Sequence, residues 1–128
     1  MKNILIFGGS GKIGFDIARD LYESGNNVII ADIKNNKKIK SLKNKNNFIR
    51  FVKCNVSIDK DIDLLLVKML ELCSKIDSVI FCAYPRSVQW GSSFLKIKRK
   101  SINEDIDGQL TSTIISAQKI IKIFIKQK

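Results

Sequence analysis

Three glycines near the amino end have the spacing of a phosphate-binding turn. Gly8, Gly11 and Gly14 follow a short apolar stretch, residues 4–7, and lead into a helical pattern. In such a turn the first glycine makes the tight bend, the second lets the backbone approach a pyrophosphate, and the third lets the new helix pack closely on the strand. The free N–H groups of that helix then face the phosphates. The pattern favours dinucleotide binding; a turn that only joins two elements is the alternative.

An acidic residue strengthens the dinucleotide interpretation. A second apolar run, residues 27–31, ends in Asp32, eighteen residues after Gly14. A carboxylate there accepts hydrogen bonds from the adenosine ribose hydroxyls and repels a 2′-phosphate. We therefore expect NAD as the cofactor. NADP is the less favoured alternative, because Lys34, Lys37 and Lys38 lie close enough to attract an extra phosphate.

Length and composition narrow the class of protein. The 128 residues fit one domain, residues 1–128. No apolar run approaches the roughly 18 residues that a membrane span needs, and no signal peptide is recognisable, so we expect a cytoplasmic protein without membrane contact. Cys54, Cys73 and Cys82 are odd in number and form no Cys-x-x-Cys pair, which suits reduced thiols. Because the chain has no histidine, Ser-His and Cys-His nucleophiles are excluded and a metal site is not expected.

The charge of +11 and pI of about 9.7 raise the question of nucleic-acid binding. Phe48 and Phe51 lie beside the most basic stretch and would be the stacking residues. However, Lys, Asn and Ile are abundant along the whole chain, and residues 48–52 are better explained as a half-buried strand with Arg50 outward. We therefore do not expect nucleic acid as the main partner. The basic stretch contains Lys34, Lys37, Lys38, Lys40, Lys43, Lys45, Arg50 and Lys53.

Strand and helix patterns alternate along the chain. This alternation, with right-handed crossovers, predicts an α/β doubly wound parallel sheet of order 3-2-1-4, with a ligand crevice between the first and fourth strands. Ser57 is the expected cap of the second long helix. The expected strands are 3–7, 28–31, 48–52 and 78–82, the last one apolar enough to be buried on both faces; the expected helices are 12–24, one after residue 57 and one from about residue 101; residues 34–47 form a weak helix or loop, and 83–100 an irregular segment.

Apolar periodicity assigns one face to each helix. The first helix carries Ile13, Ile17, Ala18 and Leu21 on one face. The buried face of the second is expected at Ile62, Leu65, Leu66, Met69 and Leu70. The last helix has a long apolar side: Ile102, Ile106, Leu110, Ile114, Ala117, Ile121 and Phe124.

Over essentially its whole length the chain resembles the short-chain dehydrogenase/reductases. The glycine turn is similar to that family's Thr-Gly-x-x-x-Gly-x-Gly motif, matching at Gly8 and Gly14; Phe7 replaces the threonine and Lys12 the middle glycine, for which Gly11 partly compensates. Cys54-Asn55-Val56 resembles the family's Asp-Val pair, whose carboxylate accepts from the adenine amino group, and the Asn55 oxygen can still accept. The resemblance implies a Rossmann-type fold and these cofactor-binding residues: Gly8, Ser10, Gly11, Lys12, Ile13, Gly14, Asp32, Asn55, Val56 and Ala83.

Two segments are similar to a narrower branch of the family. Tyr84-Pro85-Arg86 and Gln89-Trp90-Gly91 resemble the oxidoreductases of flagellin modification and of sugar-nucleotide or surface-polysaccharide biosynthesis. The alternative is that Tyr84 and Trp90 only cover the edge of the sheet. Ala83 is the one residue retained from the family's Asn-Asn-Ala-Gly. Gln109 falls where the family has a structural asparagine, and its longer side chain places the amide differently, which weakens the case for a water-mediated proton relay.

The family's catalytic pair is missing. Its chemistry needs Tyr-x-x-x-Lys and a serine, but Tyr22 is followed four residues later by Asn26, and Tyr84 by Val88. We therefore assign no catalytic residue and interpret the chain as a cofactor-binding, amino-terminal half. The parent reaction implied is hydride transfer between nicotinamide and an alcohol or ketone of unknown identity, with a sugar nucleotide as the candidate carrier of that group. The alternative is a non-catalytic nucleotide-binding remnant or partner subunit.

The absence of the family's second half predicts an exposed apolar surface. Without the family's further strands, residues 79–82 form an apolar sheet edge that is prone to aggregation. We therefore expect marginal stability unless the chain forms a homo-oligomer or pairs with a second polypeptide.

Overall fold

Four parallel strands form the centre of the molecule in the computed structural model, which describes residues 1–42 and 46–128. They are β1 (Asn3–Phe7), β2 (Asn27–Asp32), β3 (Ile49–Lys53) and β4 (Ser78–Phe81), in the order β3-β2-β1-β4. β1 lies in the middle, pairing Ile4 with Val28 of β2 and with Ser78 of β4. The predicted fold class and strand order are confirmed. Lys43 and Lys45 of the basic stretch lie outside the described residues.

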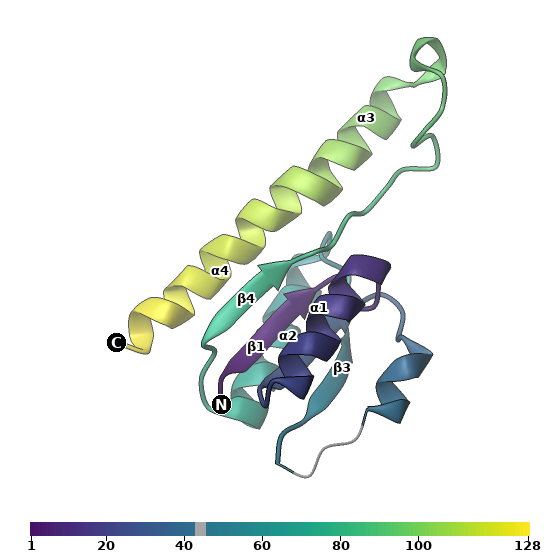
Figure 1. Ribbon diagram of the computed structural model, residues 1–128. Helices are drawn as coiled ribbons and strands as arrows, with labels where there is room; N and C mark the ends of the chain where they lie inside the picture. The colour runs from purple at the N-terminus through teal and green to yellow at the C-terminus, as the bar shows by residue number, and fades with distance from the viewer. Residues whose placement is uncertain (43–45) are drawn as a thin grey trace.

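Helices cover both faces of the sheet (Figure 1). α1 (Lys12–Glu23) packs on the face that carries Ile6 and Ile30, through Phe15, Ala18 and Tyr22. α2 (Asp59–Cys73) and α4 (Ser112–Lys126) pack on the opposite face. That second core joins Leu5, Phe7, Ile29, Ala31 and Val52 of the strands to Ile62, Leu65, Leu66 and Met69 of α2 and Ile120 of α4. The sheet is therefore doubly wound, as predicted.

The first turns of α1 and α2 differ from the sequence prediction. Ile13 is 72% exposed, so it is not part of the buried face of α1, which Phe15 and Tyr22 form instead. Ile13 lies in the first turn of α1. Ser57 does not cap α2: the N-cap is Ile58, which makes no side-chain capping bond, and the Ser57 N–H instead donates to Asn55 Oδ1 at 3.0 Å.

The last helix begins earlier and is less regular than predicted. It comprises α3 (Arg99–Ile106), a π-helical turn η3 (Asp107–Thr111) and α4. Its buried side consists mainly of small residues: Ser101, Gly108, Ser112, Ser116 and then Ile120. The predicted apolar side mostly faces outward; its exposed members are Ile102, Ile106, Leu110, Ile114 and Ile121.

β4 is an edge strand of the described sheet, and its residues are only half-buried rather than buried on both faces. Phe81 stacks on Phe7 with a ring-centroid distance of 5.0 Å, yet is 37% exposed. Two short 3-10 turns complete the elements, η1 (Lys37–Ser41) and η2 (Phe94–Lys96). Within the described ranges, no helix is long and apolar enough to cross a membrane.

Candidate functional site

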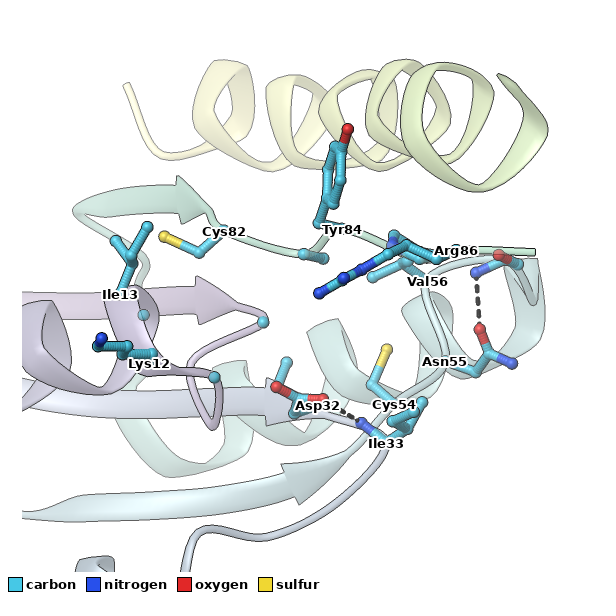
Figure 2. Close-up of a pocket in the computed structure, with 17 residues that line it drawn as sticks. Lys12, Ile13, Asp32, Ile33, Cys54, Asn55, Val56, Cys82, Tyr84 and Arg86 are labelled. Atoms are coloured by element: carbon cyan, nitrogen blue, oxygen red, sulfur yellow. Dashed lines mark hydrogen bonds between the residues drawn. The ribbon is translucent and has the colours of Figure 1, made fainter. Parts of the chain in front are cut away.

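A cleft of about 670 Å³ opens at the carboxyl ends of the four strands (Figure 2). This size is in the range of small-molecule and cofactor sites. Of the residues predicted to hold a cofactor, all except Ser10 line the cleft. They are Gly8, Gly11, Lys12, Ile13 and Gly14 from the glycine turn and α1, Asp32 at the end of β2, Asn55 and Val56 after β3, and Ala83 after β4.

Two glycines of the turn are required by the protein's own packing. Gly8 has a φ of +72°, and a Cβ there would lie 2.4 Å from the Ala83 nitrogen. A Cβ at Gly14 would lie 2.3 Å from the Gly8 carbonyl oxygen. A contact below 3.0 Å with backbone forces a shift of the main chain. Gly8 therefore makes the tight bend, and Gly14 lets α1 approach β1, as the spacing predicts.

Gly11 differs because the protein leaves space around it. A Cβ there would meet only the Gly8 carbonyl oxygen, at 3.5 Å, which is an ordinary contact, and its φ of −71° suits any residue. Gly11 is the N-cap of α1, and none of the described side chains caps this helix. The N–H groups of the first turn are therefore open to the cleft. Free N–H groups, a positive helix end and open space fit a pyrophosphate.

Asp32 is held at the cleft by two backbone groups. Its Oδ2 accepts from the Ser10 N–H at 3.0 Å, and its Oδ1 accepts from the Ile33 N–H at 2.7 Å. Each oxygen keeps a further lone pair for a ligand hydroxyl. Ser10 does not line the cleft; it positions this carboxylate, and its hydroxyl oxygen is buried with no hydrogen-bond partner in the described part of the chain.

Asn55 is already engaged within its own turn. Its side-chain Oδ1 accepts from the Ser57 N–H at 3.0 Å, and its backbone N–H donates to Asp61 Oδ2 at 2.9 Å. This fixes the amide orientation so that one Oδ1 lone pair and the NH₂ group remain for a ligand. Val56, next to it, is half-buried beside the second core and offers an apolar surface.

The structure adds lining residues that the sequence did not assign to the site. The signal for them was their position, because each lies at or just after the carboxyl end of a strand. Tyr84, Pro85 and Arg86 had been noted only for their resemblance to a family branch. The added residues are Ala31, Ile33, Cys54, Ser57, Cys82, Tyr84, Pro85 and Arg86.

The two tyrosines differ in their relation to the cleft. Tyr22 belongs to α1, is buried and does not line the cleft, whereas Tyr84 is 54% exposed and lines it. The Gln109 amide contacts the loop after β4: its Nε2 donates to the Pro85 carbonyl at 2.9 Å. Within the described residues, no cluster of three His, Cys, Asp or Glu side chains could hold a metal ion.

The family model for short chain dehydrogenases matches residues 2–128. The chain belongs to this family. It is 24% identical over 131 residues to post-translational flagellin modification protein A of Campylobacter coli, covering 98% of this chain and 51% of that protein. It is 32% identical over 129 residues to the 3-oxoacyl-(acyl-carrier-protein) reductase FabG of Rickettsia typhi, covering 99% of this chain and 50% of that protein.

Solved structures of the family share the fold. A 3-oxoacyl-(acyl-carrier-protein) reductase from Brucella melitensis, in complex with NAD, superposes with a TM-score of 0.85 at 24% identity and covers 97% of this chain and 49% of its own. A short chain dehydrogenase from Leptospira borgpetersenii with bound NAD⁺ gives a TM-score of 0.82 at 21% identity, covering 98% of this chain and 47% of its own. The chain spans about half the length of the curated relatives it matches.

Proposed function

We propose that the cleft binds a nicotinamide dinucleotide, NAD in preference to NADP. The observation that carries this proposal is the Asp32 carboxylate, held at the cleft by the N–H groups of Ser10 and Ile33. A carboxylate fixed there accepts from ribose hydroxyls and repels a 2′-phosphate. The pyrophosphate would lie on the N-terminus of α1, at the N–H groups of Lys12 and Ile13.

The adenine would occupy the part of the cleft after β3. Val56 offers an apolar contact, and Asn55 keeps one oxygen lone pair and an amide NH₂ for the ring edge. Gly8 and Ala83 form the floor between the two ends of the dinucleotide, where a Cβ at Gly8 would already meet Ala83.

For the whole protein we propose a hydride-transfer oxidoreductase acting on an alcohol or ketone. The nicotinamide supplies the hydride acceptor or donor, and this chain's residues bind and orient it. A sugar-nucleotide substrate in surface-polysaccharide or flagellin modification is the finer proposal. Its support is the Tyr84-Pro85-Arg86 segment at the cleft and the similarity to flagellin modification protein A.

The second candidate is a nucleotide-binding module that does not turn over a substrate by itself. It is supported by the positions of the two tyrosines: Tyr22 is buried, and Tyr84 has Val88 in place of the partner lysine. Oxidation of NADH by the 128-residue chain with candidate keto-sugar nucleotides, measured at 340 nm, distinguishes the two candidates. Turnover would favour the enzyme, and binding without turnover the module.

The cysteines bear on the compartment of the protein, and the apolar surface bears on its partners. The three cysteines are free thiols in the structure, which supports our proposal of a reducing cytoplasm. The outward apolar side of α3 to α4, with Leu110 58% exposed and Ile121 53% exposed, supports pairing with another copy or with a second polypeptide.

Replacing Asp32 tests the cofactor proposal. In Asp32→Ala we expect the affinity for NADH to fall about tenfold, because two hydroxyl contacts to a charged acceptor are lost. NADPH should bind better than to wild type, because the repulsion of the 2′-phosphate is removed. Fluorescence titration of both reduced cofactors measures the two changes.

The control is Glu71→Ala on α2, which removes the same charge at an exposed site outside the cleft lining. If Asp32→Ala leaves NADH affinity unchanged and NADPH binding does not improve, the role of this carboxylate is wrong. If the wild-type chain binds neither cofactor, the proposed function fails.

A further inference from the structure

Arg86 extends from the loop after β4 into the cleft. Figure 2 shows its side chain running across the site, from the β4 wall toward the side where Asp32 and the glycine turn lie. Among the described residues, Arg86 forms no ion pair within 4.0 Å, although its guanidinium carbon lies 5.9 Å from the centre of the Tyr84 ring. Arg86 therefore presents an unpaired cation inside the cofactor cleft.

The backbone on both sides of Arg86 is anchored to the last long helix. Before it, the Pro85 carbonyl accepts from Gln109 Nε2 at 2.9 Å. After it, the Ser87 N–H and hydroxyl both donate to the Asp105 carboxylate, at 2.6 and 2.9 Å. These three bonds link residues 18 to 24 positions apart, so they fix the loop to the helix rather than shaping it locally.

The π-helical turn lies at this contact. η3 contains Gly108 and Gln109, and a Cβ at Gly108 would lie 2.9 Å from the Pro85 Cβ. The missing side chain at Gly108 thus lets Pro85 approach the helix. Gln109, in the same π-helical turn, donates from its Nε2 to the Pro85 carbonyl. Such turns inside helices often occur at functional sites. Here the π-helical turn contacts Pro85 and so helps to position Arg86, the next residue in the chain.

The charges in the cleft identify the group that Arg86 would bind. A guanidinium presents a planar fork of donors that matches a phosphate in geometry and charge. Asp32, the acidic residue of the lining, already accepts two backbone N–H groups. A dinucleotide would bring a diphosphate to the N-terminus of α1, between that helix and the β4 wall.

We propose that Arg86, positioned by Asp105 and Gln109, donates to the diphosphate of the bound dinucleotide from the wall opposite the α1 N-terminus. Arg86 is then a specificity-determining residue for phosphate, and Asp105 and Gln109 are positioning residues. This rests on the proposed function, because it assigns a further contact within the same cleft.

Ligands with and without phosphate test the contact. The wild-type chain and the variants Arg86→Ala and Arg86→Lys are titrated with adenosine, ADP, NADH and NADPH, by calorimetry or by NMR shifts for the weak ligands. In Arg86→Ala we expect ADP and NADH affinity to fall about tenfold, as for loss of a charge-assisted hydrogen bond, and adenosine affinity to stay unchanged. Arg86→Lys should retain part of the affinity. Arg99→Ala, which removes the same charge from an exposed helix position outside the lining, should match wild type.

The positioning residues are tested by coupling. Asp105→Asn and Gln109→Ala should each weaken ADP several-fold and leave adenosine unchanged, and neither should weaken ADP further in the Arg86→Ala background. A residue that only stabilises the fold would instead lower both ligands' affinities and add to the effect of Arg86→Ala. Circular dichroism confirms that each variant is folded.

Three results would overturn the inference: ADP affinity unchanged in Arg86→Ala, equal losses for adenosine and ADP, or a loss confined to NADPH, which would place Arg86 at a 2′-phosphate. The failure of the proposed function looks different, since the wild-type chain would then bind neither ADP nor NADH.

Discussion

Cys54 is a cleft residue whose ionisation the fold suppresses. Burial raises the pKa of its thiol to about 11, and the nearby carboxylates of Asp61 and Asp32 add to the effect. The thiol is therefore protonated and a weak nucleophile at neutral pH. Cys54 directly precedes Asn55 and Val56. It contributes an apolar surface beneath the cleft rather than a reactive group.

This raised pKa predicts a pH dependence of stability. The unfolded thiol ionises near its ordinary pKa of 9.0, whereas the folded thiol keeps its proton until about pH 11. The contribution of Cys54 is therefore fully present below pH 9 and is lost as the pH rises toward 11. Urea unfolding across this range should show a smaller decline of the free energy of unfolding in Cys54→Ala than in wild type. Equal declines in both proteins would contradict the assignment.

Single side chains were predictable where the local motif fixes them. The roles of Gly8 and Gly14 follow from spacing, because a turn between a strand and its packed helix needs them wherever it occurs. Arg86 was not assigned to the site, because its neighbours Ser87 and Pro85 are held by residues far along the chain, Asp105 and Gln109. Asn55 was predicted to accept from a ligand, but spacing could not show that Ser57 already uses part of its oxygen.

In the turn between β1 and α1, we expect Gly14 to be needed for stability and Gly11 to be needed for ligand binding. Gly14→Ala should destabilise the chain by about 1–3 kcal/mol, because its Cβ would meet the Gly8 carbonyl oxygen and push α1 away from β1. Gly11→Ala has room for its Cβ and should cost less than about 1 kcal/mol as an N-cap change, yet it should weaken NADH binding about tenfold or more by obstructing the pyrophosphate.

Urea unfolding and NADH titration of the two variants measure both effects. The expected pattern is a stability loss in Gly14→Ala and a binding loss with preserved stability in Gly11→Ala. Normal NADH binding by a folded Gly11→Ala chain would contradict the location of the pyrophosphate.

The type and order of the helices and strands were predictable from the sequence. The face that each helix buries was less predictable. Periodicity counts any apolar residue, so it grouped Ile13 with the apolar face of the first helix, although Ile13 is exposed and lines the cleft. In the last helix, the apolar stripe is long and regular, yet the buried side carries Ser112 and Ser116. Small residues permit close approach to the sheet and loop, as Gly108 does at Pro85, and local spacing does not reveal that preference.

At the scale of the whole molecule, the sheet order follows from the alternation of strands and helices, because right-handed crossovers leave few arrangements. The helix from α3 to α4 lies on the β4 side of the sheet (Figure 1). This helix carries exposed apolar residues, and β4 is an edge strand that is only half-buried. Both are consistent with a chain that spans about half the length of its curated relatives. The expectation of a second subunit or polypeptide on this side stays a prediction.

In the proposed function, this chain binds a dinucleotide in the cleft at the carboxyl ends of the strands. Isothermal titration calorimetry of the wild-type chain with NADH and with NADPH tests it most directly. We expect saturable binding of one NADH per chain, with NADH bound more tightly than NADPH because of Asp32. Absence of binding by either cofactor would contradict the dinucleotide site, and tighter binding of NADPH would contradict the role of Asp32.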